Sequence, residues 1–347
     1  MQIAMTLAEE IKREARALGF QAVGISRIET FPEGTATSLS RSLHARLLEW
    51  LRRGFHGTMS WIAREPHRRA DPRTILAGCR SVISVGMNYY TEHRADERPG
   101  HGRIARYAWG EDYHTVLKKR LEELEDRIRT LAPLAETRAY VDTGPVMEKA
   151  WAQQAGLGWI GKHSNLVSEQ YGSWLLLGEI LTTLDLEQDE PGTDLCGSCT
   201  LCLRACPTGA ITEPYVVDAR QCISYLTIEL HQPGDEIPDD LARKMGNRIF
   251  GCDDCLDVCP YNVNALPTAE RAFQPSPLTL APFLTELSDL TDREFAATFR
   301  RSPIRRAKHA GFVRNVRVAL KNLSPIVSSC LPISANTRKA PVLPPSS

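Results

Sequence analysis

The chain has 347 residues, of which 42% are hydrophobic and 24% are charged, and its formal net charge is zero. This composition is typical of a soluble globular protein, and the length is sufficient for two domains. No apolar run approaches the roughly 20 residues that a membrane-spanning helix needs, and the first twenty residues lack the apolar core of a secretory signal. We therefore expect a cytoplasmic protein without a membrane segment.

The first half of the chain alternates helical and strand patterns. Apolar residues at helical spacing predict helices at residues 6–18, 38–51, 113–131 and 146–155. Short apolar runs closed by turn or polar residues predict strands at residues 20–26, 81–87, 138–142 and 174–183. This alternation predicts an α/β domain over residues 1–188.

Eight of the ten cysteines belong to one spaced pattern. A first run reads C-x2-C-x2-C-x3-C-P, which is the spacing of bacterial ferredoxins. A second run also ends in Cys-Pro but lacks the first cysteine of that pattern. The members of the two runs are, in order, Cys196, Cys199, Cys202 and Cys206, and then Cys252, Cys255 and Cys259. The pattern predicts a ferredoxin-like domain with two 4Fe–4S clusters at residues 189–268, and hence electron transfer.

The cysteine count closes at four ligands for each cluster. In two-cluster ferredoxins, three cysteines of each run hold one cluster and the fourth cysteine binds the other cluster. Cys222 is the only cysteine between the runs, so it replaces the missing ligand. The expected ligand sets are Cys196, Cys199, Cys202 and Cys259 for one cluster, and Cys206, Cys222, Cys252 and Cys255 for the other.

Other uses of these cysteines fit less well. Paired C-x2-C motifs also form structural zinc sites, but the three-cysteine core and the Cys-Pro endings favour clusters. Disulfides are a weaker alternative because the chain is too long to need them and carries no secretory signal. We expect no ligand role for Cys79 or Cys330.

The C-terminal part is predicted to be helical over residues 269–323 and basic at its end. Eight cations and no acid lie between residues 300 and 321, namely Arg300, Arg301, Arg305, Arg306, Lys308, Arg314, Arg317 and Lys321. Such a stretch is either a phosphate-binding face or one solvated face of a helix, and the second interpretation is the simpler one. The tail at residues 324–347 is rich in Pro and Ser, and we expect it to be disordered.

Several local motifs together resemble those of the epoxyqueuosine reductase family. They are MSWIAR at 59–64, RYAWGEDYH at 106–114, VDTGP at 141–145, GLGWIGKHSNL at 156–166, YGSWLLLGE at 171–179, and GNR at 246–248. The resemblance runs from about residue 5 to residue 320. It implies a cobalamin-dependent enzyme that carries out the last step of queuosine synthesis on tRNA.

The resemblance implies a nitroreductase-like first domain that holds cobalamin without a lower histidine ligand. In agreement, the D-x-H-x-x-G motif that offers a histidine to cobalt is incomplete here, because Leu117 replaces its glycine. The positions that match the family's cobalamin contacts are Arg64, Ala105, Asp142, Leu166, Leu177 and Ser224.

Asp142 also matches the family's proton donor. Opening an epoxide requires a proton for the departing oxygen, and burial in an apolar setting would raise the pKa of Asp142 and keep it protonated. The alternative is that Asp142 caps the helix after Pro145. His114, Lys162 and His163 are rival acids.

The expected reaction reduces epoxyqueuosine to queuosine at the wobble position of tRNA. The implied partners of this monomer are the tRNA anticodon arm and an external electron donor, and the clusters deliver electrons one at a time. One alternative is an enzyme similar to reductive dehalogenases, but relatives of that type carry a twin-arginine signal and use a tyrosine. The other is a non-enzymatic electron carrier, which would not need a domain of about 185 residues before its clusters.

Overall fold

An antiparallel four-stranded sheet organises the N-terminal part of the computed structural model, which describes residues 5–29, 37–95, 98–232 and 234–329. Its strands follow the order β1-β2-β7-β4, and each neighbouring pair is antiparallel. Their bounds are β1 at Ala22–Arg27, β2 at Ser81–Asn88, β7 at Leu175–Thr182 and β4 at Thr137–Tyr140. The four strands overlap the four expected segments, so the mixed α/β expectation is confirmed for this region.

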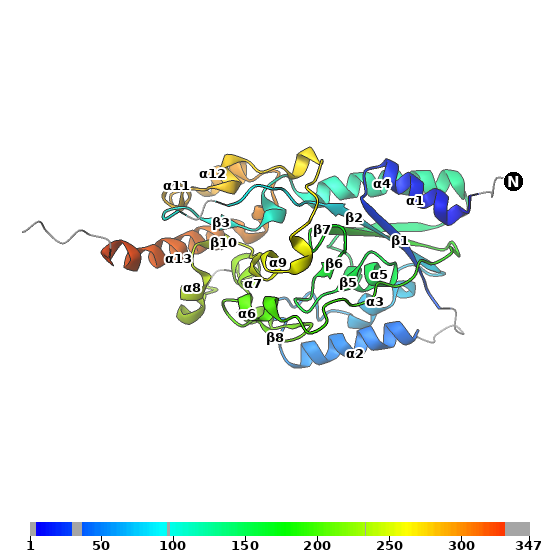
Figure 1. The fold of residues 1–347 in the computed structure, drawn as a ribbon, viewed down its shortest axis with the longest axis horizontal. Helices are drawn as coiled ribbons and strands as arrows, with labels where there is room; N and C mark the ends of the chain where they lie inside the picture. The colour runs from blue at the N-terminus through cyan, green and yellow to red at the C-terminus, as the bar shows by residue number, and fades with distance from the viewer. Residues whose placement is uncertain (1–4, 30–36, 96–97, 233, 330–347) are drawn as a thin grey trace, which may run out of the picture.

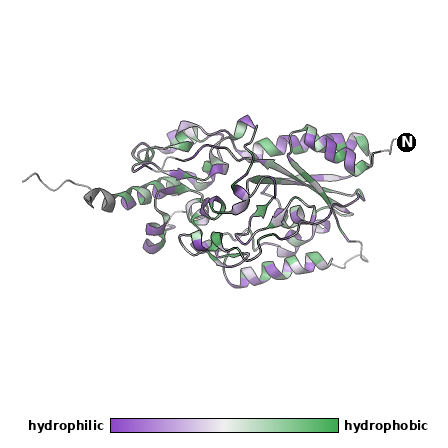
Figure 2. Ribbon diagram, in the orientation of Figure 1, coloured by the Kyte–Doolittle hydropathy of each residue, from purple (hydrophilic) through white to green (hydrophobic). Residues whose placement is uncertain are grey.

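Helices cover both faces of this sheet (Figure 1). The helices α1 (Leu7–Ala17) and α4 (Tyr113–Leu131) lie together on one face, and α5 (Glu148–Gln154) packs on the other. Beyond α5 lie α2 (Ser38–Arg52) and α3 (Pro66–Ala70). Hydrophobic and hydrophilic residues alternate along the long helices, as expected for helices with one buried face (Figure 2).

Alternation along β7 builds a core on each side of the sheet. Leu176 and Ile180 belong to the core under α1 and α4, whereas Leu177 and Leu181 pack toward the α5 side. Successive side chains of a strand point to opposite faces, so β7 is buried on both sides. A polar residue on this strand must therefore be buried as well.

Two expected boundaries near Asp142 are wrong. The strand β4 ends at Tyr140, so Asp142 lies in the following loop with a φ of 55°. The helix α5 begins at Glu148 with Met147 as its N-cap. Asp142 therefore does not cap α5, and that alternative is excluded.

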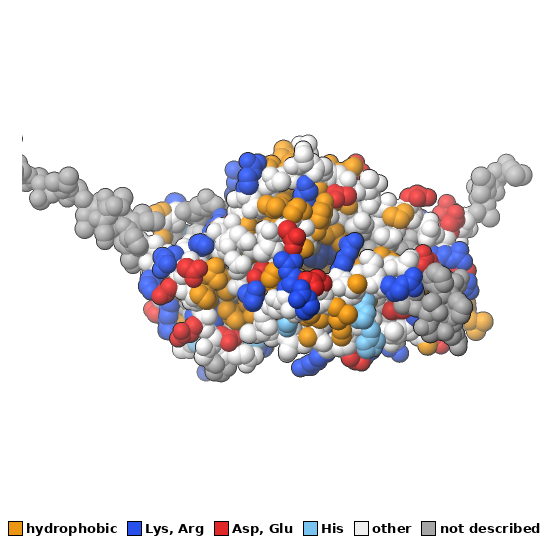
Figure 3. All heavy atoms as spheres, turned by 90° about the horizontal axis from the view of Figure 1, so that it is seen from below, with side chains coloured by type: hydrophobic (Ala, Val, Ile, Leu, Met, Phe, Trp, Pro, Cys, Tyr) orange, Lys and Arg blue, Asp and Glu red, His pale blue; other side chains and the backbone are white. Residues whose placement is uncertain are grey.

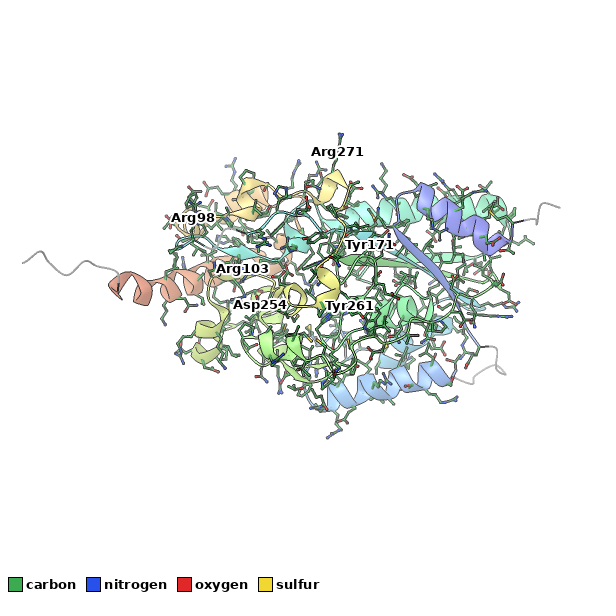
Figure 4. The ribbon with its side chains drawn as sticks, in the orientation of Figure 1. Arg98, Arg103, Tyr171, Asp254, Tyr261 and Arg271 are labelled. Atoms are coloured by element: carbon green, nitrogen blue, oxygen red, sulfur yellow. The ribbon has the colours of Figure 1, made fainter. Side chains whose placement is uncertain are left out.

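Short elements and the loops between them carry the patterned cysteines. Their bounds are α6 at Leu201–Ala205, β8 at Ile211–Glu213, β9 at Val216–Val217, α7 at Ile223–Ile228, α8 at Asp239–Met245, β10 at Arg248–Phe250 and α9 at Asp254–Asp257. The strand β10 pairs in parallel with β3 (Arg103–Ile104). Arg103 also lies 3.7 Å from the carboxylate of Asp254 (Figure 4). The cysteine region is thus joined to the first half of the chain through backbone pairing.

The C-terminal part consists of several short helices and one long helix. These are α10 at Pro277–Leu280, α11 at Leu284–Ser288, α12 at Asp292–Thr298 and α13 at Lys308–Ser329. Their buried aromatic side chains, Phe295, Phe299 and Phe312, form a second core with Ile249 and Phe250 of β10. The basic stretch is therefore not one helix, because a 3-10 helix at Pro303–Ala307 precedes α13.

The helix α13 continues past the expected end at residue 323, and residues 330–347, with Cys330, lie outside the described residues. The remaining short elements are the hairpin of β5 (Trp159–Ile160) and β6 (Leu166–Val167) and five further 3-10 helices. Those are Pro72–Thr74, Arg106–Ala108, Ala219–Gln221, Pro260–Asn262 and Arg271–Phe273. Within the described ranges, no helix has the length and apolar character needed to cross a membrane.

Candidate active site and cluster-binding cysteines

A cavity of about 260 Å³ brings most of the expected cobalamin contacts together. Asp142, Leu166, Leu177 and Ser224 all line it. These residues come from the loop after β4, from β6, from β7 and from α7. The wall also includes three tyrosines, Tyr89, Tyr107 and Tyr113. The cavity therefore combines apolar side chains with several polar groups that converge on it, as cofactor sites do.

The other two expected contacts do not line this cavity. Ala105 is buried at the start of a 3-10 helix and lies directly against Gly251, where an added Cβ would come within 2.5 Å of the Ala105 Cβ. Arg64 is exposed in the segment before α3. Ala105 thus allows two backbone segments to approach closely, and Arg64 lies outside the cavity wall.

Asp142 is held by three hydrogen bonds. Its Oδ2 accepts a hydrogen bond from the Tyr113 hydroxyl at 2.8 Å and lies 3.2 Å from Nε2 of His114. Its backbone N–H donates to Oε1 of Glu148 at 2.5 Å. The side chain is 58% exposed, into the site. Asp142 is thus a fixed carboxylate at the edge of the cavity.

The expected protonation of Asp142 is wrong for this structure. Desolvation by the surrounding protein raises its pKa, but the hydrogen bonds from His114 and Tyr113 lower it further, so the pKa lies below its ordinary value. Sequence reasoning considered burial alone and missed both donors. Tyr113 and His114 follow Asp112 at the start of α4, and only the tertiary fold brings them to Asp142.

His114 holds the proton that was expected on Asp142. Burial lowers the pKa of His114, but the carboxylates of Asp112 and Asp142 raise it to about 9. Nδ1 lies 2.7 Å from Asp112 Oδ1, and Asp112 itself caps α4. At neutral pH the imidazole ring is therefore cationic and adjoins Oδ2 of Asp142.

The other two rival acids have different surroundings. His163 is buried, and burial together with the charge of Lys149 lowers its pKa to about 4. The Lys162 ammonium donates to the carbonyl oxygens of Gly197 and Cys199 at 2.5 and 3.0 Å. Of the three rivals, His114 is the one hydrogen-bonded to Asp142.

The eight patterned cysteines gather in two sets of four. Burial raises the pKa of the Cys259 thiol, and the neighbouring thiols of Cys196 and Cys199 raise it further. Cys202 interacts with the same two thiols. We call Cys196, Cys199, Cys202 and Cys259 the outer set.

The second set lies next to the cavity. Burial raises the pKa of the Cys255 thiol, and the thiols of Cys222, Cys252 and Cys206 add to this effect. Cys252 lines the same cavity as Asp142. We call Cys206, Cys222, Cys252 and Cys255 the inner set. The two sets have the same members as the two expected ligand sets, whereas ligation itself stays a prediction.

The surroundings of the sulfur atoms suit thiolate ligands. The indole N–H of Trp159 lies 3.4 Å from Sγ of Cys196, and the backbone N–H of Ala210 donates to Sγ of Cys206 at 3.3 Å. Such donors stabilise the cysteine sulfurs of iron–sulfur clusters and tune their potentials. In the described part of the chain, no three His, Cys, Asp or Glu converge as on a single metal ion. A 4Fe–4S cluster differs from that arrangement, because each thiolate binds its own iron.

A second cavity, of about 760 Å³, adjoins the first, and its wall holds both acids (Asp112, Glu122, Glu125 and Asp292) and cations. Arg300, Arg305, Arg306 and Lys308 line it together with His114. The basic stretch is therefore not simply the solvated face of one helix. The net positive charge of this stretch is also smaller in the folded protein than its sequence suggests, because acids from distant parts of the chain form ion pairs with some of its cations. Those pairs are Arg301 with Glu111, Arg306 with Glu229, and Lys321 with Asp239.

Comparisons with known proteins agree with this arrangement. Residues 69–143 match the protein family described as epoxyqueuosine reductase QueG, DUF1730, and residues 195–262 match a 4Fe–4S double cluster binding domain. The chain is 46% identical to the epoxyqueuosine reductase of Synechocystis sp. over 80% of this chain and 94% of that protein. It is 43% identical to the Escherichia coli enzyme over 91% of this chain and 81% of that protein.

Solved structures with these names share the fold. A crystal structure of epoxyqueuosine reductase with an epoxyqueuosine-modified tRNA-Tyr stem loop matches with a TM-score of 0.82 and 32% identity, covering 91% of this chain and 81% of that one. A Bacillus subtilis epoxyqueuosine reductase, with its catalytic aspartate loop swung out of the active site, matches with a TM-score of 0.81 and 29% identity, covering 96% of this chain and 86% of that one. With this identity over most of its length, the chain belongs to the epoxyqueuosine reductase family.

Proposed function

We propose that this protein reduces epoxyqueuosine to queuosine at the wobble position of tRNA. The relatives that match most of the chain have this activity in their names. One observation carries the proposal for this chain's own residues. Cys252 of the inner set and Asp142 line one cavity, so an electron source and a proton source meet at a single site.

Cobalamin is the proposed cofactor in that cavity, on a nitroreductase-like domain. Its apolar side chains suit the flat face of a corrin ring, with Leu166 and Leu177 against the ring and Ser224 as a polar contact. Arg64 would contact only a part of the cofactor that extends beyond this cavity, and Ala105 would keep the neighbouring backbone close. When bound, cobalamin supplies a low-valent cobalt that reduces the epoxide, a reaction that no protein side chain can perform.

The protein's own contribution is the supply of electrons and protons. Loss of the epoxide oxygen as water, with an alkene left behind, consumes two electrons and two protons. We infer that 4Fe–4S clusters on the outer and inner sets pass electrons from an external donor toward the cavity, since Cys252 borders it. The proposed domain limits are 1–188 for the cofactor domain, 189–268 for the ferredoxin-like domain and 269–323 for the basic helical part.

Asp142 is the proposed proton donor to the departing oxygen, and His114 is the proposed source of its proton. The His114 Nε2–H adjoins Asp142 Oδ2 at 3.2 Å, so one proton can move between them without rearrangement. Tyr113 holds the same oxygen atom in place. The Bacillus subtilis relative, in which a catalytic aspartate loop is named, supports this role for Asp142.

The side of the larger cavity that the basic stretch forms is the proposed site for the tRNA backbone. Arg300, Arg305 and Lys308 line it beside His114, and a relative has been crystallised with a modified tRNA stem loop. The face shown in Figure 3 has basic and acidic side chains interspersed, in keeping with the zero net charge. We expect the cations of this cavity, near the proposed active site, to supply the phosphate contacts.

Anaerobic reconstitution with iron, sulfide and cobalamin, followed by assay on tRNA that carries epoxyqueuosine, tests the proposal. Corrin absorption bands and formation of queuosine are expected. A protein that carries iron–sulfur clusters but binds no cobalamin and leaves the tRNA unchanged would refute it and favour an electron carrier. Activity on a halogenated phenol but not on tRNA would instead favour the dehalogenase-like alternative.

A further inference from the structure

Two acids lie behind the Asp142 loop, one half-buried at the cavity wall and one fully buried. Glu148 stands in the first turn of α5, and Glu179 lies on β7 with none of its surface exposed. Charged side chains are almost never fully buried unless they are paired. Glu179 is also the one charged residue of an otherwise apolar strand, LLLGEILT. Its burial therefore requires an explanation.

The two carboxyl groups raise each other's pKa. Within the described residues, neither oxygen of Glu179 has a hydrogen-bond donor, and the hydroxyl of Ser84, opposite on β2, has no partner either. The carboxyl group of Glu148 is close enough to Glu179 for the two groups to interact electrostatically. Burial and the mutual repulsion of the two groups raise the pKa of both. Two facing carboxyl groups can form a hydrogen bond only when one of them holds a proton.

An oxygen of Glu148 accepts a hydrogen bond from the Asp142 loop. Oε1 of Glu148 accepts the backbone N–H of Asp142 at 2.5 Å. The ammonium of the neighbouring Lys149 is directed elsewhere, because it donates to the carbonyl oxygen of Ser164 at 2.7 Å and to Asn165 Oδ1 at 3.1 Å. Glu148 is thus the acceptor that anchors this part of the loop.

The conformation of Asp142 makes such an anchor necessary. Its φ of 55° is in the left-handed region, which is unfavourable for residues other than glycine. A residue in this conformation persists only when several contacts hold it. Tyr113 and His114 hold the side chain, and Glu148 holds the backbone. Without the backbone contact, the loop could relax and carry the carboxylate away from the cavity.

We propose that Glu148 is a positioning residue whose carboxyl group, supported by a proton shared with Glu179, holds the Asp142 loop against the cavity. This inference rests on the proposed function, since it assigns the pair to the acid of that reaction. In this role the pair acts through Asp142, although Glu148 also lines the cavity. The proposed series of contacts therefore runs from Glu179 in the core to Glu148, then to the backbone of Asp142 and its carboxylate.

Hydrogen–deuterium exchange on the reconstituted protein without tRNA tests the anchor directly. The variants are Glu148→Ala, Glu148→Gln and Glu179→Gln, with Glu286→Ala on the exposed side of α11 as the control. In Glu148→Ala, amide exchange over residues 141–147 should rise by roughly 10- to 100-fold, as expected for loss of a hydrogen bond to a charged group. Glu148→Gln keeps an acceptor oxygen, and Glu179→Gln keeps a donor to Glu148, so both should stay within about threefold of wild type.

Steady-state kinetics separates positioning from a general loss of structure. Glu148→Ala should lower kcat by at least tenfold and leave KM for tRNA, iron content and corrin bands unchanged, with Glu148→Gln restoring most of kcat. Unchanged exchange over residues 141–147 in Glu148→Ala, or equal damage in Glu148→Gln, would overturn the inference. The exchange experiment needs no turnover. A wild-type protein inactive on epoxyqueuosine tRNA would therefore refute the proposed function separately.

Discussion

Replacing Asp142 by Asn tests the proposed acid and its link to His114 in one variant. The amide keeps the size of the side chain and an oxygen that can accept from Tyr113, but it has no acidic proton. General acids contribute roughly 10²- to 10⁴-fold to the rate, so turnover should fall by that factor. Cobalamin binding and iron content should stay the same.

The same substitution should change the titration of His114. Two carboxylates raise the pKa of His114 to about 9, and Asp142→Asn removes one of them. We expect the pKa of His114 to fall by about one unit, which corresponds to about 1.4 kcal/mol. The residual elevation would come from Asp112, whose Oδ1 lies 2.7 Å from Nδ1.

Two measurements check these expectations. Single-turnover assays on epoxyqueuosine tRNA measure the chemical step, and NMR titration of the ring of His114 measures its pKa in both proteins. A variant that retains more than about a third of the wild-type rate would rule out Asp142 as the acid. A His114 pKa that is the same in both proteins would show that the ion pair seen in the structure does not form in solution.

Three further predictions concern the clusters, the tRNA contact and pH. Cys222→Ala should disrupt the inner cluster and lower the iron content from about eight to about four per chain. The control Cys79→Ala, whose thiol is buried away from both sets, should keep about eight. An iron content of about eight in Cys222→Ala would refute the assignment. Joint replacement of Arg305, Arg306 and Lys308 by Ala should weaken tRNA binding. The slope of log K against log salt concentration should become shallower by roughly 0.7–0.9 per lost phosphate contact. Arg52→Ala is the control, and an unaltered affinity and slope in the triple variant would contradict the prediction. The pKa of His114 is raised in the folded protein, so its protonated form should be fully populated below its ordinary pKa of about 6.5 and lost as the pH rises through about 9. The single-turnover rate should therefore fall near pH 9. A rate that is flat to pH 10 would exclude His114 as the proton source.

Local sequence determined the secondary elements and the chemistry of the cysteines. Helical spacing over 6–18, 38–51 and 113–131 closely matched α1, α2 and α4, and α1 and α4 each bury an apolar face. The spacing of the cysteines within each run is visible in the sequence. Together with the rule that the fourth cysteine of a run binds the other cluster, it predicted the two sets of four without any knowledge of the fold. Family resemblance added Asp142 as the acid, which periodicity could not have found.

Tertiary structure decided the state and support of that acid. Asp142 was expected to hold its own proton in an apolar setting, but α4 brings Tyr113 and His114 to its carboxylate and reverses the direction of the pKa shift. The charge of the basic stretch was likewise overestimated from the sequence, because the fold brings acids such as Glu111 and Glu229 into ion pairs with its arginines. Glu179 gave a visible signal, a single acid in an apolar strand, but its partner Glu148 could not be inferred, because the pairing depends on the packing of α5 against β7. Charges interact through space over a few ångströms, whereas sequence patterns report only on neighbours along the chain.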